Sequence, residues 1–235
     1  MSINKTSVEF DVRSSSSAGM ESRMVFKLEK RVGFHIAKRG IDIIGALAGI
    51  TIFLPLFLII SFMIKVREPQ GHVFFKQKRI GKNGKVFNII KFRSMLVNAE
   101  ERLKENAELY RKYVENNYKL EQNEDPRITK FGAFLRRTSL DELPQFVNVL
   151  KGDMSLVGPR PVVTEELREY GELKRKFLSV KPGITGYWQV SGRSDVGYPQ
   201  RVDLELYYVD NMTIWLDIKI ILITAWSVLA KKGAY

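Results

Sequence analysis

The sequence predicts an α+β protein that is mostly helical and is attached to a membrane. Three observations support this fold class: an uncharged apolar run at residues 43–64, basic clusters on both sides of that run, and an Asn-Gly turn between two strand-like segments. At 235 residues the chain corresponds to about one domain with appendages. Its formal net charge is +12, from 38 Lys and Arg against 26 Asp and Glu.

Composition excludes several classes of site and of protein. The chain contains no cysteine, so disulfide scaffolds, Cys-ligated zinc sites and thiol catalysis are excluded. It has no Walker A motif, paired G-x-G-x-x-G motif or Asp-x-Asp motif, which argues against nucleotide P-loops, Rossmann dehydrogenases and the usual metal-dependent glycosyltransferases. The positive charge surrounds an apolar segment and no nucleic-acid-binding signature is found. Anionic lipid headgroups and anionic substrates therefore explain the charge, and no nucleic-acid partner is expected.

The apolar segment at residues 43–64 is long enough to enter a bilayer. Its 22 uncharged residues make a helix roughly 33 Å long, which is close to the thickness of the bilayer hydrocarbon. It starts too far into the chain and is too long for a signal peptide. A buried helix of a soluble protein is the alternative.

The flanks of this segment predict its path. Lys and Arg exceed acidic residues by five at residues 23–39 and by eight at residues 65–93. Because such an excess marks the cytoplasmic side, both flanks belong in the cytoplasm. Pro55 removes a backbone hydrogen bond and should kink the helix. We therefore expect a re-entrant membrane hairpin, in which the helix enters the bilayer, bends at Pro55 and returns to the same side. The rest of the protein is then expected on the cytoplasmic face of the inner membrane.

Three regions are expected along the chain. Residues 1–22 contain a run of four serines and are predicted to be a disordered tail. Residues 23–67 comprise a basic interfacial helix and the membrane hairpin, and residues 68–235 form a cytoplasmic catalytic domain. Gly45 and Gly49 form a GxxxG pair, which is either a helix-packing face or ordinary composition for so apolar a helix.

The remaining elements follow from local patterns. Strand-like runs at residues 73–75 and 86–90 flank Asn83-Gly84, the strongest short-range hairpin signal, and predict a basic β-hairpin. Residues 212–230 are apolar with Trp215 and Trp226 near the ends, which predicts a surface-lying amphipathic helix. The glycine-rich loop with Trp188 either binds a ligand or simply turns. Further helices are expected at residues 98–122, 128–137, from about 140–144, and 163–178.

The adjacent carboxylates of Asp141 and Glu142 are the candidate catalytic groups. Pro144 is tolerated only in a first helical turn, so a helix should begin close to Asp141. A helix start favours anions, and Arg136 precedes the dyad. One carboxylate could hold Mg²⁺ while the other attacks phosphorus. Ser139 and Glu142 also fit a capping box, and the spacing alone leaves both interpretations open.

Seven collinear stretches identify a family resemblance. They are residues 38–42 (KRGID), 91–95 (KFRSM), 125–129 (DPRIT), 135–145 (LRRTSLDELPQ), 152–161 (GDMSLVGPRP), 181–189 (KPGITGYWQ) and 233–235 (GAY). Together they resemble the bacterial sugar transferase family, the monotopic phosphoglycosyl transferases that prime capsule, exopolysaccharide and O-antigen synthesis. The resemblance extends from about residue 35 to residue 235.

The resemblance implies an activity and roles for particular residues. Family members transfer a sugar-1-phosphate from a UDP-sugar to undecaprenyl phosphate, release UMP and use Mg²⁺. It implies that Asp141 is the nucleophile of a covalent intermediate and that Glu142 is the Mg²⁺ ligand. Arg136 and Arg160 would contact phosphate or nucleotide, and Lys91 matches a further basic position near the site. The family also shows the re-entrant hairpin.

Some questions stay open at this level. The competing function is a membrane-tethered binding or scaffold protein without catalysis. The residues do not distinguish glucose, galactose and N-acetylated sugars, and they leave homodimer formation undecided. The helix expected at residues 98–122 has no evident purpose.

Overall fold

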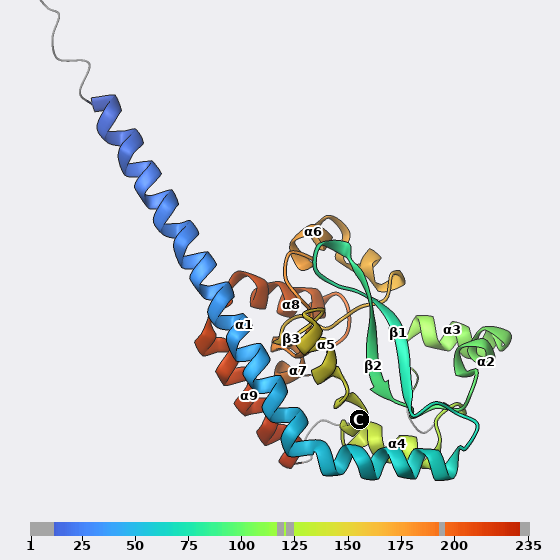
Figure 1. Ribbon diagram of the computed structural model, residues 1–235. Coiled ribbons are helices and arrows are strands. Elements are labelled where there is room, and N and C mark those ends of the chain that lie inside the picture. The colour runs from blue at the N-terminus through green and yellow to red at the C-terminus, as the bar shows by residue number, and fades with distance from the viewer. Residues whose placement is uncertain (1–11, 117–119, 121–124, 193–195, 231–235) are drawn as a thin grey trace, which may run out of the picture. The chain divides into compact units, whose positions relative to one another are not determined.

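The computed structural model describes residues 12–116, 120, 125–192 and 196–230. It divides into two units, residues 1–40 and 41–235. The described chain is mostly helical with two small two-stranded sheets, which confirms the predicted fold class at this level (Figure 1). All side-chain contacts given below lie within the second unit.

The first element, α1 (Val12–Arg67), is one long helix with Pro55 inside it. Residues 12–22, which the sequence assigns to a disordered tail, belong to this helix, and residues 1–11 lie outside the described residues. In Figure 1 the ribbon of α1 changes direction in its C-terminal part, as the loss of a backbone donor at a proline predicts. The described helix therefore bends, whereas the re-entrant hairpin and its path through a membrane remain a prediction.

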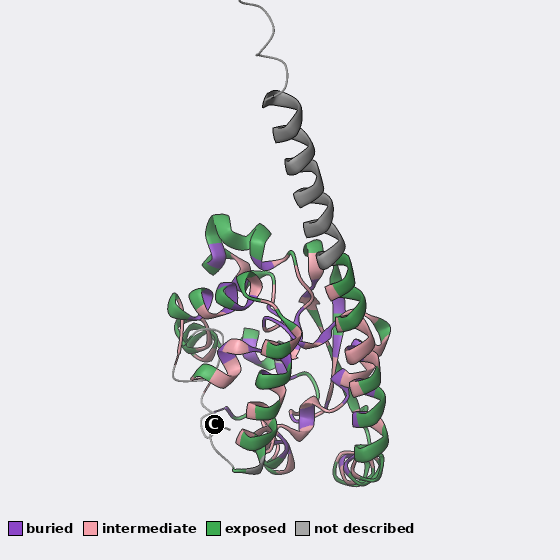
Figure 2. Cartoon of the chain, turned by 90° about the vertical axis from the view of Figure 1, so that its left-hand side faces the viewer, coloured by how far each residue is buried: buried purple, intermediate pink, exposed green. Residues whose placement is uncertain are grey.

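The apolar part of α1 has one exposed face and one packed face. Residues Val32–Arg67 are long and apolar enough to cross a membrane by length and composition. Ile44 and Ile52 are each 70% exposed, and Figure 2 shows exposed residues along much of the described helix. Such a continuous apolar surface is typical of a face that contacts lipid.

The GxxxG pair of α1 lies on the packed face. A Cβ atom at Gly45 would collide with the side chain of Leu156, and one at Gly49 would collide with the ring of Phe146. The two glycines therefore let the chain after α1 approach the helix closely, and the helix-packing interpretation of this motif is confirmed.

The basic β-hairpin is present as predicted. Strands β1 (Phe74–Ile80) and β2 (Val86–Phe92) pair antiparallel, and a single 3₁₀ turn, η1 (Lys82–Gly84), connects them. Asn83 and Gly84 have φ values of +57° and +79°, and Asn-Gly sequences adopt this left-handed conformation readily.

The helical segment expected at residues 98–122 is broken into α2 (Ala99–Glu105) and α3 (Ala107–Glu115). The break occurs at Asn106, whose side chain accepts a hydrogen bond from the backbone N–H of Leu109 at 3.0 Å and so caps α3. Residues 117–119 and 121–124 lie outside the described residues.

The rest of the domain is built from short elements. They are α4 (Lys130–Arg137), η2 (Leu140–Glu142), α5 (Gln145–Lys151), β3 (Ser155–Val157), η3 (Glu165–Leu173), α6 (Lys174–Phe177), β4 (Gly183–Thr185), α7 (Tyr187–Ser191), α8 (Gln200–Asp210) and α9 (Ile214–Leu229). The helix expected at residues 163–178 is broken at Gly171, which has a φ of +47°. The glycine-rich loop contains β4, which pairs parallel with β3, and α7.

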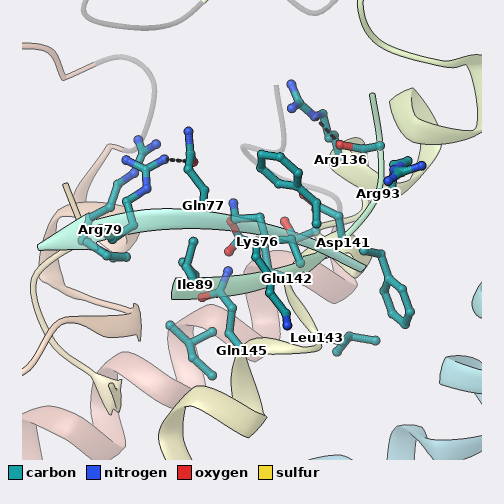
Figure 3. Close-up of a pocket in the computed structure, with 18 of the residues that line it drawn as sticks. Lys76, Gln77, Arg79, Ile89, Arg93, Arg136, Asp141, Glu142, Leu143 and Gln145 are labelled. Atoms are coloured by element: carbon teal, nitrogen blue, oxygen red, sulfur yellow. Dashed lines mark hydrogen bonds and ion pairs between the residues drawn. The ribbon is translucent and has the colours of Figure 1, made fainter. Parts of the chain in front are cut away.

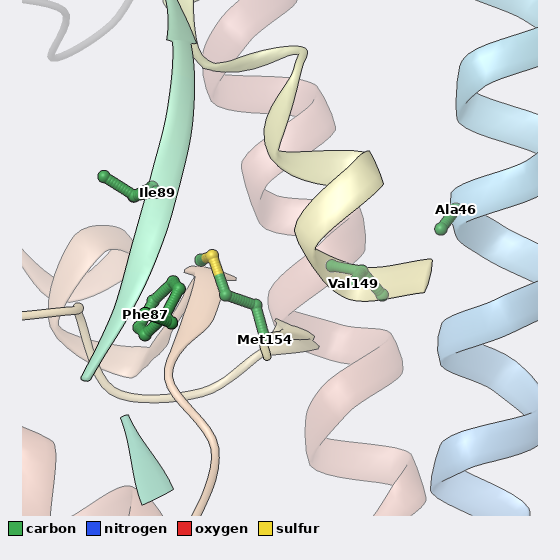
Figure 4. Packing of buried hydrophobic residues seen from close by; sticks show 5 residues of the cluster. All are labelled: Ala46, Phe87, Ile89, Val149 and Met154. Atoms are coloured by element: carbon green, nitrogen blue, oxygen red, sulfur yellow. The ribbon is translucent and has the colours of Figure 1, made fainter. Parts of the chain in front are cut away.

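One hydrophobic cluster joins the apolar part of α1 to the elements around the site. Ala46 of α1, Phe87 and Ile89 of β2, Val149 of α5, and Met154 pack together and are buried (Figure 4). Truncation of a large member to alanine costs about 2–5 kcal/mol in such clusters. The cluster thereby fixes β2 and α5 relative to α1.

Buried polar groups hold strand β3 from two sides. The Oδ1 atom of Asp42, on α1, accepts hydrogen bonds from the Ser155 hydroxyl at 2.8 Å and the Leu156 N–H at 2.9 Å. The Tyr208 hydroxyl lies 2.7 Å from Asp217 of α9 and 3.1 Å from the Val157 carbonyl oxygen. Strand β3 is therefore fixed to both apolar helices just before the turn that follows it.

A helix, α9, is present near the predicted position, and most of its exposed residues are apolar. Asp217 and Ile220 are buried, whereas Trp215, Leu222 and Trp226 are exposed. A helix with exposed tryptophans and a buried polar residue fits a membrane interface better than contact with water.

Candidate active site

A cavity of about 1960 Å³ lies beside the β-hairpin. Its walls come from α1, the two hairpin strands, α2 and α3, η2, the turn after β3, and α9. The five residues that sequence analysis singles out all line it: Lys91, Arg136, Asp141, Glu142 and Arg160. Figure 3 shows Asp141, Glu142 and Arg136 in this wall together with Arg79 of β1.

The carboxylates of Asp141 and Glu142 lie in a 3₁₀ turn directly before α5 rather than in its first turn. The Glu142 N–H donates to the Ser139 carbonyl oxygen at 3.2 Å, and Pro144 is the N-cap residue of α5. Ser139 has a φ of +56°, and its side chain makes no capping hydrogen bond, so the capping-box alternative is not what the chain adopts. A non-glycine residue in this conformation costs about 1–3 kcal/mol and is typical of functional sites.

The pKa values of the two carboxylates shift in opposite directions, and Lys91 of β2 acts on both. Its Nζ atom lies 2.6 Å from Oε1 of Glu142. Burial favours a raised pKa for Glu142, but the charge and hydrogen bond of Lys91 hold that pKa below its usual value. Burial raises the pKa of Asp141 to about 6, with Lys91 opposing the rise and Glu142 adding to it. Adjacent carboxylates with divergent pKa values are typical of groups that perform different steps.

Arg136 is placed by close packing of α4 on the chain after β2. A Cβ atom at Gly132 would collide with the carbonyl group of Ser94, so only glycine permits this approach. The Nε atom of Arg136 donates to the Ser94 hydroxyl at 2.9 Å. The charge of Arg136 also lowers the pKa of Asp141, against the larger effect of burial. Arg137, its neighbour, is exposed.

Arg160 lies in the turn that follows β3. Its backbone N–H donates to both carboxylate oxygens of Glu205, each at 3.2 Å. Its guanidinium carbon lies 5.7 Å from the centre of the Trp188 ring. The charge of Arg160 contributes to lowering the pKa values of both Glu142 and Glu166, against burial, so it acts on both carboxylates.

Sequence analysis missed a buried ion cluster beside Arg160, which we define as Arg79, Glu166, Arg201 and Glu205. The Oε1 atom of Glu166 lies 3.4 Å from Nη1 of Arg79, and its Oε2 atom lies 3.4 Å from Nη1 of Arg201. The hydroxyl of Tyr198 donates to Oε2 of Glu166 at 3.1 Å. The carboxylate of Glu166 thus contacts two guanidinium groups and one phenol hydroxyl.

Arg201 and Glu205 form the other half of the buried ion cluster. The Arg201 guanidinium carbon lies 4.4 Å from the Trp188 ring centre and 4.9 Å from that of Tyr198, and its Nε atom is 3.6 Å from Glu205. Glu205 is 0% exposed, and burial raises its pKa to about 7 while Arg201 opposes the rise. Arginine and glutamate four residues apart, interleaved with apolar residues, are the sequence signal that could have indicated a buried charged face.

Apolar residues of the two apolar helices also line the cavity. Ile44 and Phe53 of α1, and Ile221 and Val228 of α9, line it. The cavity therefore connects a polar wall, which carries the carboxylates and arginines, with the two helices whose exposed faces are apolar.

The donor set suits a magnesium ion only if a ligand supplies further oxygens. Among the described residues no group of three or more His, Cys, Asp or Glu side chains could hold a metal. Asp141 and Glu142 offer two carboxylates, and one of the oxygens of Glu142 already contacts Lys91. Mg²⁺ is usually held by one or two carboxylates with substrate phosphates and water, so these residues fit that ion in the presence of a phosphate ligand.

Comparison with known proteins adds independent information. A family model described as bacterial sugar transferase matches residues 33–231. A Salmonella typhimurium protein named undecaprenyl-phosphate galactose phosphotransferase is 48% identical over 201 residues, which cover 84% of this chain and 41% of that protein. A Haemophilus influenzae protein named uncharacterized sugar transferase is 47% identical, over 87% of this chain and 43% of that protein.

A third relative is similar over nearly its whole length. The exopolysaccharide production protein ExoY of Rhizobium meliloti is 42% identical over 204 residues, which cover 85% of this chain and 88% of ExoY. This chain thus spans less than half the length of the first two relatives.

Proposed function

This chain belongs to the bacterial sugar transferase family, and we propose that it transfers a sugar-1-phosphate from a UDP-sugar to undecaprenyl phosphate with release of UMP. The reaction would prime synthesis of an exopolysaccharide, capsule or O-antigen. One observation carries the proposal: a single cavity is lined both by the carboxylates of Asp141 and Glu142 and by apolar residues of α1 and α9. A water-soluble donor and a lipid acceptor can therefore reach one point.

Asp141 acts as the nucleophile in this proposal. One of its carboxylate oxygens attacks the phosphorus that bears the sugar, the bond from that phosphorus to the oxygen of UMP breaks, and UMP leaves with the bonding electrons. A phosphate oxygen of undecaprenyl phosphate then attacks the same phosphorus and displaces the Asp141 carboxylate. The product is a sugar linked to undecaprenyl diphosphate. The pKa of Asp141, about 6, supports this role because the group is ionised at neutral pH.

The neighbouring residues stabilise charge in this reaction. Arg136 and Arg160 contact phosphate oxygens, for which the planar guanidinium fork is well suited. Lys91 keeps Glu142 ionised. Mg²⁺, held by Glu142 and donor phosphates, would neutralise negative charge on the diphosphate.

The membrane supplies the acceptor in this proposal. In this proposal residues 43–64 form a re-entrant hairpin, because both flanking segments are strongly basic and Pro55 lies within the apolar part of α1. The protein then lies on the cytoplasmic face of the inner membrane, where UDP-sugars occur, and its basic flanks contact anionic lipid headgroups.

The experiment that tests this function measures UMP release. Purified protein is incubated with undecaprenyl phosphate, Mg²⁺ and a panel of UDP-sugars; UDP-galactose comes first because a relative is named for galactose. We expect UMP and lipid-linked sugar phosphate in equal amounts with one sugar, and neither product after EDTA treatment. A scaffold without catalysis would release no UMP with any donor.

A second experiment tests the covalent route. A double displacement predicts ping-pong kinetics and a burst of UMP when the UDP-sugar is added without lipid. Mass spectrometry should then find one sugar phosphate added at Asp141. Direct transfer in a ternary complex predicts no UMP until both substrates are present, and an unmodified Asp141 would reject the covalent route while leaving the transferase proposal intact.

A further inference from the structure

Arg79 lies in the cavity wall and has no part in the reaction described above. It is near the end of strand β1, and its side chain is 12% exposed. Its Nη2 atom donates to Oε1 of Gln77 at 2.7 Å (Figure 3). Its Nη1 atom donates to Oε1 of Glu166 at 3.4 Å. The residue is thus a largely buried cation in the wall of the cavity that the carboxylate dyad also lines.

The hydrogen-bonding capacity of Arg79 is incompletely used. A guanidinium group carries five N–H donors, and the Nε atom of Arg79 is buried with no hydrogen-bond partner among the described residues. The 3.4 Å contact with Glu166 is long for a charge-assisted hydrogen bond, which usually measures 2.7–2.9 Å. Glu166 also shares its charge with Arg201 and Tyr198. A buried donor without an acceptor is costly, and the guanidinium group that carries this donor lines the cavity, where a ligand with acceptor oxygens would add the missing hydrogen bonds to the group.

The surroundings of Arg79 indicate which ligand. Burial lowers the pKa of Arg79, and the charge of Arg160 lowers it further, so the two guanidinium groups act on each other. Both also contribute to lowering the pKa of Glu142. Two positively charged groups in a buried wall repel each other. An anion with several oxygens bound between them would attract both groups and offset that repulsion.

We propose that Arg79 is a second arginine of the donor site, binding the diphosphate together with Arg160 while Glu166 holds its side chain in place. The identity of the donor as a nucleoside diphosphate sugar rests on the proposed function. Arg79 contributes from the hairpin and Arg160 from the turn after β3, so the diphosphate would lie between two separate segments of the chain.

The test compares binding of inorganic pyrophosphate and of UDP to the full chain in nanodiscs, measured by calorimetry. Arg79→Gln should weaken binding of both ligands by roughly tenfold or more, since it removes a charged donor pair. Arg168→Gln is the matched control: Arg168 is exposed, pairs with Glu169 near the same carboxylate Glu166, and does not line the cavity. It should bind both ligands as the wild type does.

Melting temperatures separate a binding role from a structural one. If Arg79 only braces Glu166, Arg79→Gln lowers the melting temperature and leaves the pyrophosphate affinity of the folded protein unchanged, which overturns the proposal. Should Arg79→Gln not fold, Arg79→Lys keeps the buried charge without the fork, and wild-type pyrophosphate affinity in that variant overturns the proposal equally. Arg79-dependent pyrophosphate binding by a protein that releases no UMP would reject the proposed reaction but support this site.

Discussion

The backbone N–H of Arg160 is held by both carboxylate oxygens of Glu205, at 3.2 Å each, although the two residues are 45 positions apart. Glu205 is fully buried and lies on α8, which no local pattern had predicted. Glu205 therefore helps to fix the turn that carries Arg160, together with backbone hydrogen bonds from the Gly158 N–H to Thr185 and from the Gly183 N–H to Pro159. Its contribution is to position another residue, since Glu205 itself does not line the cavity.

The effect of substituting Glu205 on UDP-sugar binding should depend on whether the new side chain still accepts a hydrogen bond from the Arg160 N–H. Glu205→Leu leaves the Arg160 N–H buried without an acceptor, at a cost of about 1–3 kcal/mol, and we expect the KM for the UDP-sugar to rise roughly tenfold or more. Glu205→Gln retains one acceptor oxygen and should rescue most of that loss. The KM for undecaprenyl phosphate should change little in either variant.

Asp203→Asn provides the control for this experiment, because Asp203 is an exposed residue on the same helix. It should leave both KM values unchanged. Equal KM values for the UDP-sugar in Glu205→Leu and wild type would contradict the positioning role. A fall in kcat for both substrates with no change in either KM would instead indicate a general loss of folded enzyme.

Arg160→Lys tests whether the fork of the guanidinium is needed. If Arg160 binds the diphosphate through two parallel hydrogen bonds, a lysine cannot reproduce them, and kcat/KM for the UDP-sugar should fall at least about tenfold. Circular dichroism should show an unchanged fold, because the backbone contact with Glu205 does not involve the substituted side chain. Full activity of the lysine variant would mean that a simple positive charge suffices.

The sequence predicted those elements whose signals are local. Asn83-Gly84 specified the hairpin turn because both residues adopt positive φ readily. Thr129 caps α4 through a hydrogen bond to the Gly132 N–H at 2.9 Å, near the predicted start of that helix. Proline at position 144 likewise placed the start of α5.

Features that depend on tertiary burial were missed. Arg201 and Glu205 look like a solvated ion pair in the sequence, yet they are buried among aromatic rings. Asn106 interrupts the helix expected at residues 98–122 because its side chain caps the following turn more effectively than it supports a continuous helix. Of the candidate site, the local pattern indicated Asp141, Glu142 and Arg136, and the resemblance added Lys91 and Arg160. Arg79 emerged only from its position in the cavity wall.

The membrane path can be tested by cysteine labelling, because the chain has no cysteine of its own. Cysteine at Glu21 and at Gln70 should both be protected from a membrane-impermeant thiol reagent in intact cells and become reactive after lysis. Labelling of one position from outside would establish a crossing instead of a re-entrant hairpin. Pro55→Leu restores a backbone donor and should favour a straight span, so its Cys variants should shift towards labelling on one side.

The pH dependence of activity should follow Asp141. Its pKa of about 6 means that the carboxylate is protonated, and therefore a poor nucleophile, at lower pH. The rate of UMP release should fall as the pH drops through about 6 and level off above about 7. A rate that stays constant down to pH 5 would contradict a nucleophilic Asp141.

The contribution of Asp141 to the stability of the folded protein should depend on pH in the opposite sense to its contribution to the rate. Because the folded-state pKa of Asp141 lies above its value of 3.8 in the absence of burial, the folded protein binds more protons between pH 4 and 6, and its stability falls as pH rises through that window. Asp141→Asn removes the buried charge, so we expect an inactive protein that is more stable than wild type at pH 7.5, by roughly 1–3 kcal/mol. The difference should vanish below about pH 4.

Glu142→Gln is the matched comparison. Lys91 lowers the folded-state pKa of Glu142, so the ionised carboxylate stabilises the wild type, and this variant should be less stable than the wild type at pH 7.5. Thermal unfolding of the two variants across pH measures both effects, and a destabilised Asp141→Asn protein at pH 7.5 would show that the carboxylate is not held against its preferred protonation state.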